Sequence, residues 1–128
     1  MSAVDTTPLE VLAERLTSCV EAEKWKAARA LASRLVKSQP SEPRWWMIYA
    51  LCMRRTGSIH AAQQILLKAV AVHQRDARMH FDLARYTCAA GQTDEAKRYL
   101  QDAIILNRGV RDLALDGPDL KPIWDSIN

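Results

Sequence analysis

The sequence has few residues of the kinds that mark secreted or membrane-spanning proteins. Only three of its 128 residues are cysteine, and no two of them form a C-x-x-C pair. An odd number of widely separated thiols fits neither a disulfide framework nor a zinc site, and it predicts reduced, mostly packed cysteines in a cytoplasmic protein. No run of about 18 apolar residues is present, so we expect no membrane span. Residues 1–8 have neither a basic flank nor an apolar run, so we expect no signal peptide there.

An excess of charge of one sign is also missing. The chain has 18 basic and 15 acidic residues, a formal net charge of +3 that does not by itself indicate a nucleic-acid-binding protein. Apolar residues make up 48% and charged residues 26%, the balance of a folded domain rather than a disordered chain. At this length we expect one domain, residues 1–128. Bases exceed acids only in residues 43–110, by ten to five.

Sequence motifs for catalysis are absent as well. The chain has no G-x-S-x-G, H-E-x-x-H, glycine-rich phosphate loop or paired-carboxylate motif. Its three histidines, His60, His73 and His80, have no spacing that joins them to a candidate nucleophile or metal ligand. We therefore expect no enzymatic activity, no cofactor and no metal site.

What the sequence does contain is an internal repeat. Residues 43–76 and 77–110 read as one unit written twice, at a spacing of 34 residues. In each copy the first four matched sites step by 0, 3, 4 and 7, which places them on one face of a helix. A glycine follows, expected to end this helix in a left-handed conformation, and then a second stripe of small and apolar residues. The matched pairs include Trp46 and His80, Tyr49 and Leu83, Ala50 and Ala84, Met53 and Thr87, Gly57 and Gly91, Ala62 and Ala96, and Ala69 and Ala103.

A weaker copy precedes these two. Residues 9–42 place Ala28, Ala32 and Leu35 at the inner sites of a second helix, but Glu23 replaces the turn glycine. A first repeat has no neighbour on one side, so more polar outer sites are expected of it.

The 34-residue period ends after residue 110. The segment 116–118 reads Asp-Gly-Pro and should break a helix, after which Asp119 is expected to cap a further short helix. That helix presents one apolar stripe, formed by Ile123, Trp124 and Ile127. We expect it to cover the exposed face of the last repeat, and the alternative is that Trp124 anchors a second subunit in a homo-oligomer.

The repeat resembles the tetratricopeptide repeat, a 34-residue helix-turn-helix unit. The resemblance rests on Trp46, Gly57, Ala62, Ala69, Leu83, Gly91, Ala96 and Ala103. Ala50 and Ala84 stand where the family usually has glycine, so the small residue is kept. The resemblance implies an all-α fold, a right-handed α-solenoid of three helix-turn-helix hairpins. The repeats would span residues 9–42, 43–76 and 77–110, with a C-terminal cap at 111–128.

In tetratricopeptide stacks the first helices line a concave groove that holds peptides, so the resemblance implies that their outer face meets a ligand. The sequence independently shows an apolar strip bordered by arginines on this face. The candidate groove residues are Arg44, Met47, Ile48, Leu51, Arg54, Arg55, Arg78, Phe81, Asp82 and Arg85. The alternative for Met47 and Phe81 is packing between adjacent repeats.

Arginines beside apolar surface suit a partner with carboxylates and a hydrophobic stripe. We therefore expect a scaffold or adaptor that binds an acidic-apolar peptide or an amphipathic helix. A bacterial secretion-type chaperone is the alternative that length and repeat count allow. RNA binding through the arginines is less expected, because Phe81 is the one stacking residue on this face and Asp82 lies among the bases.

Overall fold

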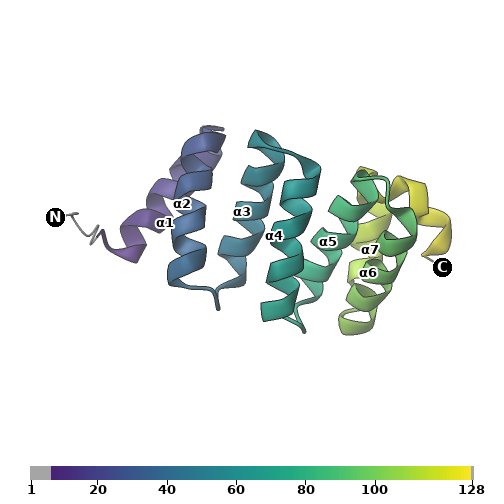
Figure 1. Cartoon of the computed structure of the whole chain (residues 1–128). Helices are drawn as coiled ribbons and strands as arrows, with labels where there is room; N and C mark the ends of the chain where they lie inside the picture. Colours follow the sequence, from purple (N-terminus) through teal and green to yellow (C-terminus); the bar gives the residue numbers. More distant parts are fainter. Residues whose placement is uncertain (1–6, 128) are drawn as a thin grey trace.

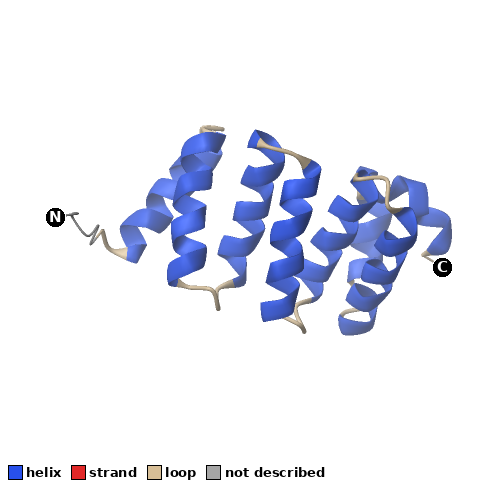
Figure 2. Ribbon diagram, viewed as in Figure 1, coloured by secondary structure: helices blue, strands red, loops and turns tan. Residues whose placement is uncertain are grey.

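The computed structural model describes residues 7–127. The expectation that no signal peptide is present rests mainly on residues 1–6, which lie outside this part. All regular elements of the described chain are helices, arranged as three consecutive hairpins and a C-terminal segment (Figures 1 and 2). The elements are α1 (Leu9–Glu21), α2 (Trp25–Ser38), α3 (Pro43–Thr56), α4 (Ile59–Val72), α5 (Ala77–Ala89), α6 (Thr93–Leu106), α7 (Val110–Asp116) and the 3-10 helix η1 (Pro118–Ser126). From α1 to α6 each helix packs on the next, which confirms the all-α solenoid.

The apolar stripes of the repeats form the core, as their spacing predicts. Ala50 and Ala84 are almost completely buried, and such small side chains let the helices of a hairpin approach closely. The adjacent indoles of Trp45 and Trp46 are both buried, and each N–H has a partner. Trp45 Nε1 donates to Gln39 Oε1 at 2.9 Å, and Trp46 Nε1 donates to the Pro40 carbonyl at 2.7 Å. The tryptophan pair therefore joins α3 to the loop that precedes it.

Of the three turns inside the hairpins, one has the expected left-handed glycine and two differ from the expectation. Gly91 has a φ of +85°, the predicted left-handed conformation. Gly57 has a φ of −129°, so the prediction is wrong there. A Cβ at position 57 would lie 3.1 Å from the Met53 carbonyl oxygen, so close approach to α3 is what favours glycine at this turn. In the first repeat Glu23 itself adopts a φ of +57°, so the turn keeps its shape without glycine.

Helix α5 is the centre of the C-terminal half, because it contacts α4, α6, α7 and η1. Its side chains divide between two cores: Met79 and Leu83 pack with the first two repeats, whereas Phe81, Ala84 and Cys88 pack with the C-terminal segment. Leu120 and Ile123 of η1 and the adjacent Ile127 are buried. The half-buried Trp124 donates its indole N–H to the Ala114 carbonyl at 2.8 Å. The stripe of Ile123, Trp124 and Ile127 therefore covers the last repeat of its own chain.

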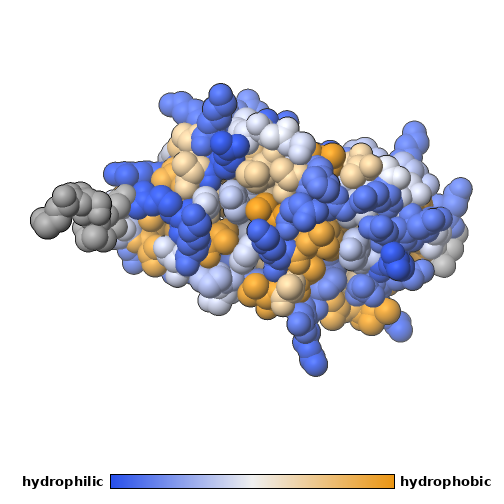
Figure 3. Space-filling model, viewed as in Figure 1, coloured by the Kyte–Doolittle hydropathy of each residue, from blue (hydrophilic) through white to orange (hydrophobic). Residues whose placement is uncertain are grey.

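The surface is mixed in character. In the view of Figure 3, hydrophilic side chains cover much of the face and apolar side chains show between them. Among the large apolar residues of the described part, Ile105, near the end of α6, is the most exposed, at 81%. Among the helices of residues 7–127, none is both long enough and apolar enough to cross a membrane.

Candidate functional site

A groove runs between α3 and α5, the first helices of the second and third repeats. It consists of two adjoining pockets. One, of about 380 Å³, is lined by Met47, Ile48, Leu51, Arg78, Asp82, Arg85 and Tyr86. The other, of about 360 Å³, is lined by Leu51, Arg54, Arg55, Arg85, Tyr86 and Asp119. The two pockets share Leu51, Arg85 and Tyr86 and therefore adjoin, and together they are here termed the α3–α5 groove.

The floor of the α3–α5 groove is apolar. Leu51 lies one helical turn after the adjacent residues Met47 and Ile48 on the same face of α3, and all three are half-buried. Tyr86 closes the floor from α5 and is only 5% exposed. The guanidinium groups of Arg54 and Arg85 lie 5.0 Å and 5.8 Å from the centre of its ring, in the range of cation–π contacts.

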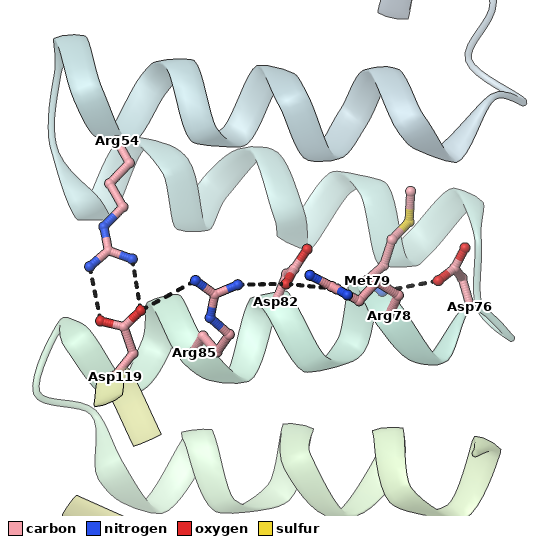
Figure 4. Close-up of polar contacts among 7 residues, drawn as sticks. All are labelled: Arg54, Asp76, Arg78, Met79, Asp82, Arg85 and Asp119. Atoms are coloured by element: carbon pink, nitrogen blue, oxygen red, sulfur yellow. Dashed lines mark hydrogen bonds and ion pairs between the residues drawn. The ribbon is translucent and has the colours of Figure 1, made fainter. Parts of the chain in front are cut away.

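A row of alternating charges follows the groove (Figure 4). Arg54 Nη1 and Nη2 each donate to one carboxylate oxygen of Asp119, both at 3.1 Å. Arg85 Nη2 also donates to Asp119, at 3.4 Å, and its Nη1 donates to Asp82 at 3.0 Å. Arg78 Nε completes the row with a bond of 3.4 Å to the same oxygen of Asp82. The five residues thus alternate as base, acid, base, acid and base, and the two carboxylates balance two of the three positive charges in this row.

The two carboxylates of this row have pKa values shifted in opposite directions. The hydrogen bonds from Arg54 lower the pKa of Asp119 below its ordinary value, and the charges of Arg54 and Arg85 act in the same direction. Burial raises the pKa of Asp82, although the charges of Arg78 and Arg85 oppose this shift. The side chain of Asp82 is 11% exposed and that of Asp119 is 21% exposed. Asp119 is therefore held as a carboxylate, whereas burial works against the charged form of Asp82.

Two arginines at the edges of the groove keep more contact with water. The side chain of Arg78 is 55% exposed, and its guanidinium lies 5.7 Å from the Phe81 ring. Arg55 is also exposed, with its guanidinium 5.4 Å from the ring of Trp25, and it makes no ion pair with any residue of the described chain. These two side chains can reach carboxylates brought by another molecule.

The structure brings together eight of the ten predicted groove residues. Arg44 lies instead in a separate hollow between α1 and α3, beside Glu14 and Thr17 and over the ring of Trp45 at 4.3 Å. The prediction is wrong for Phe81. This side chain is 4% exposed and packs with Leu120 and Ile123, so it does not line the groove. The prediction assumed that the outer face of α5 is open. The C-terminal segment covers Phe81 and Cys88 on this face.

Two groove residues were not predicted. Tyr86 could have been found from helical spacing, because it lies four residues after Asp82 on the same face of α5. Asp119 was expected to cap a helix, and this is wrong: η1 begins at Pro118, and the Asp119 carboxylate binds Arg54 and Arg85 instead. No local pattern in the sequence indicates this contact, since its partners are 65 and 34 residues away.

The part of the chain that the structure describes has no group of three or more His, Cys, Asp and Glu side chains placed to hold a metal ion. The α3–α5 groove offers an apolar floor, arginine donors at its edges and two carboxylate acceptors that are already engaged. A ligand with apolar side chains and carboxylates matches this arrangement.

The sequence and the structure are similar to known proteins. Residues 17–71 match the family model described as tetratricopeptide repeat. No curated protein matches the sequence. Among solved structures, that of MamA aligns with a TM-score of 0.75 at 16% identity, over 96% of this chain and 74% of the other.

The names of two further similar structures refer to chaperones. PcrH, solved in complex with the chaperone binding region of PopB, aligns with a TM-score of 0.69 at 19% identity, over 99% of this chain and 97% of the other. The type III secretion translocator chaperone SycD of Yersinia enterocolitica aligns with a TM-score of 0.69 at 18% identity, over 93% of this chain and 84% of the other. An O-GlcNAc transferase of Thermobaculum terrenum also matches, but this chain spans only 22% of its length. At these identities the likeness shows the fold alone.

Proposed function

Because the chain carries tetratricopeptide repeats, we propose that it is a non-enzymatic protein-interaction module that binds an acidic-apolar peptide or an amphipathic helix in the α3–α5 groove. The observation that supports this most directly is the half-buried apolar floor of Met47, Ile48 and Leu51, with exposed arginines at its edges. Apolar surface in a concave site, with a few polar groups around it, is typical of peptide-binding sites.

The length of the groove limits the ligand segment that it can hold. From Met47 to Arg55 the groove follows eight residue steps of α3, about 12 Å at 1.5 Å per residue. This length matches about four residues of an extended peptide or two turns of a helix. Apolar side chains of the ligand would rest on the floor, and its carboxylates would pair with Arg55 and Arg78. The pairing of Arg54 and Arg85 with acids of the same chain argues against RNA as the ligand, because it removes phosphate-binding charge.

The proposal is tested with a phage-displayed library of random peptides selected on the folded protein. We expect the selected peptides to combine apolar and acidic residues and to lose their binding to the Leu51→Glu variant, which places a charge on the floor. The matched control is Gln64→Glu, which adds the same charge at an exposed position of α4 outside the groove. Peptides that bind the Leu51→Glu variant as well as the unaltered protein would contradict the proposal.

A bacterial secretion-type chaperone is the second candidate. It is favoured by one observation: the chain and PcrH align over nearly the whole of both, and that structure contains the chaperone binding region of PopB. In this version the α3–α5 groove would hold an extended segment of an export client. The test is co-expression with the product of a neighbouring gene that aggregates when expressed alone. Rescue of its solubility by the unaltered protein, and none by the Leu51→Glu variant, would support this candidate.

A further inference from the structure

The C-terminal segment contributes a charged wall to the α3–α5 groove. Asp119 is the one residue of η1 that lines it, and its carboxylate binds arginines from two different repeats. Three hydrogen bonds of 3.1, 3.1 and 3.4 Å hold this carboxylate. The Arg54–Arg85 pair would otherwise be a two-arginine site for a ligand's carboxylate, and the chain fills that site with an acid of its own.

Asp119 cannot easily leave this position, because the residues after it are anchored in the core. Leu120 is completely buried, Ile123 is 1% exposed and Ile127 is 6% exposed. Trp124 ties the same segment to α7 through its bond with the Ala114 carbonyl. A ligand that displaced Asp119 would have to expose these apolar side chains to water. The segment therefore behaves as a fixed part of the groove rather than as a tethered competitor that binding releases.

From this geometry we infer that Asp119 sets the charge preference of the groove, an inference that rests on the proposed peptide-binding function. At the Arg54–Arg85 position the groove rejects an acidic side chain, because a second carboxylate would lie beside Asp119 and find the arginine donors engaged. Carboxylates of the ligand are accepted only at the edges, by Arg55 and Arg78. The partner is thus an apolar segment with acids at its flanks and an uncharged residue where it passes Asp119.

Two variants with opposite expected effects test this inference. Asp119→Asn keeps the shape of the side chain but removes the negative charge that balances the two arginines, so the groove should accept an additional acid. Arg54→Gln removes the bidentate partner and leaves the Asp119 charge partly uncompensated, so the groove should accept an additional lysine or arginine. The matched control is Asp125→Asn, which changes the same charge at an exposed position of the same segment outside the groove. Circular dichroism establishes that each variant is folded.

The phage-displayed library of random peptides is selected in parallel on the unaltered protein and on the three variants. We expect peptides from Asp119→Asn to gain an acidic residue next to their apolar anchor, those from Arg54→Gln to gain a basic one, and those from Asp125→Asn to keep the original pattern. Synthetic pairs of peptides with Glu or Gln at that position are then compared by fluorescence anisotropy. The Glu peptide should gain about tenfold in affinity for Asp119→Asn over its affinity for the unaltered protein, the scale of a charge-assisted hydrogen bond.

The outcomes separate this inference from the proposed function. If the folded variants select peptides of unchanged charge, while Leu51→Glu still abolishes binding, the inference is wrong and the groove function stands. If Leu51→Glu binds the selected peptides normally, the ligand lies elsewhere and both are wrong. Should Asp119→Asn fail to fold, the Arg54→Gln selection decides alone, because its expected effect has the opposite sign.

Discussion

Asp119 and Arg54 are 65 residues apart in the sequence, yet the carboxylate of one and the guanidinium of the other form two hydrogen bonds of 3.1 Å. This contact joins the C-terminal segment to the second repeat across the outer face of α5. It also places a carboxylate at the end of a groove that the sequence predicts to be basic. The contact should therefore affect both the stability of the fold and the chemistry of the groove.

The first prediction concerns the stability that this contact provides. Asp119→Asn should lower the free energy of unfolding by about 1 to 2 kcal/mol, because charge-assisted bonds to two arginines are lost while the segment stays packed. Urea denaturation followed by circular dichroism measures this difference. The control Asp125→Asn, at an exposed position, should change the free energy by less than about 0.5 kcal/mol. Equal effects of the two substitutions would show that the contact contributes nothing specific.

The second prediction concerns pH. The bonds from Arg54 lower the pKa of Asp119 below 3.8, so its stabilisation is fully present above pH 3.8 and is lost as the pH falls through the folded value. Burial raises the pKa of Asp82 above 3.8, so its contribution is fully present below pH 3.8 and is lost as the pH rises through the folded value. The two carboxylates should therefore give the stability opposite pH dependences.

Urea denaturation of the unaltered protein, Asp119→Asn and Asp82→Asn over about pH 2 to 7 tests this pair. The stability difference between the unaltered protein and Asp119→Asn should grow with pH. The difference between the unaltered protein and Asp82→Asn should shrink with pH. Differences that change in the same direction would contradict the opposite environments of the two side chains.

The third prediction concerns the hairpin turns. Glu23 occupies the left-handed region that costs a residue with a Cβ about 1 kcal/mol or more, so Glu23→Gly should raise the free energy of unfolding by about 0.5 to 1 kcal/mol. Gly91→Ala should lower it by about 1 kcal/mol, since Gly91 has a φ of +85°. Thermal and urea unfolding measure both changes. A stabilising Gly91→Ala would show that the turn does not need its left-handed conformation.

The fourth prediction separates the core from the groove. Phe81→Ala should lower the free energy of unfolding by about 3 to 4 kcal/mol, because it leaves a cavity between α5 and η1. Met47→Ala, on the half-buried floor, should cost about 1 kcal/mol but should weaken binding of the selected peptides. The measurements are urea unfolding and fluorescence anisotropy. If a folded Phe81→Ala variant lost peptide binding strongly, while Met47→Ala bound the peptides as well as the unaltered protein, the assignment of Phe81 to the core and Met47 to the groove would be wrong.

The fifth prediction concerns the thiols. Burial raises the pKa of Cys52 to about 11, and burial together with the nearby Asp119 charge raises that of Cys88. Cys19 is only half-buried. Iodoacetamide at neutral pH should therefore modify Cys19 of the folded protein at least about tenfold faster than Cys52. After unfolding in urea, it should modify all three thiols at similar rates. Mass spectrometry of peptides from timed reactions gives the rates, and similar rates in the folded protein would contradict the buried position of Cys52.

Most of the groove could be predicted because its residues lie on two regular helices. Once the 34-residue period assigns Ala50 and Ala84 to the inner faces, the opposite faces follow from 3.6 residues per turn. This geometry identifies Met47, Ile48 and Leu51 without any knowledge of the neighbouring elements. Spacing alone does not show what lies over those faces, and for this reason Phe81 was assigned to the groove although it is buried.

The sequence by itself determined the local units: the three hairpins, their inner stripes and the break at residues 116–118. These follow from interactions between residues three or four positions apart, which every helix makes in the same way. Only the tertiary structure decided that η1 folds back on α5, covers Phe81 and brings Asp119 to Arg54 and Arg85. The path of the chain after a helix break depends on which apolar surfaces pack best together, and that competition involves residues far apart in the sequence.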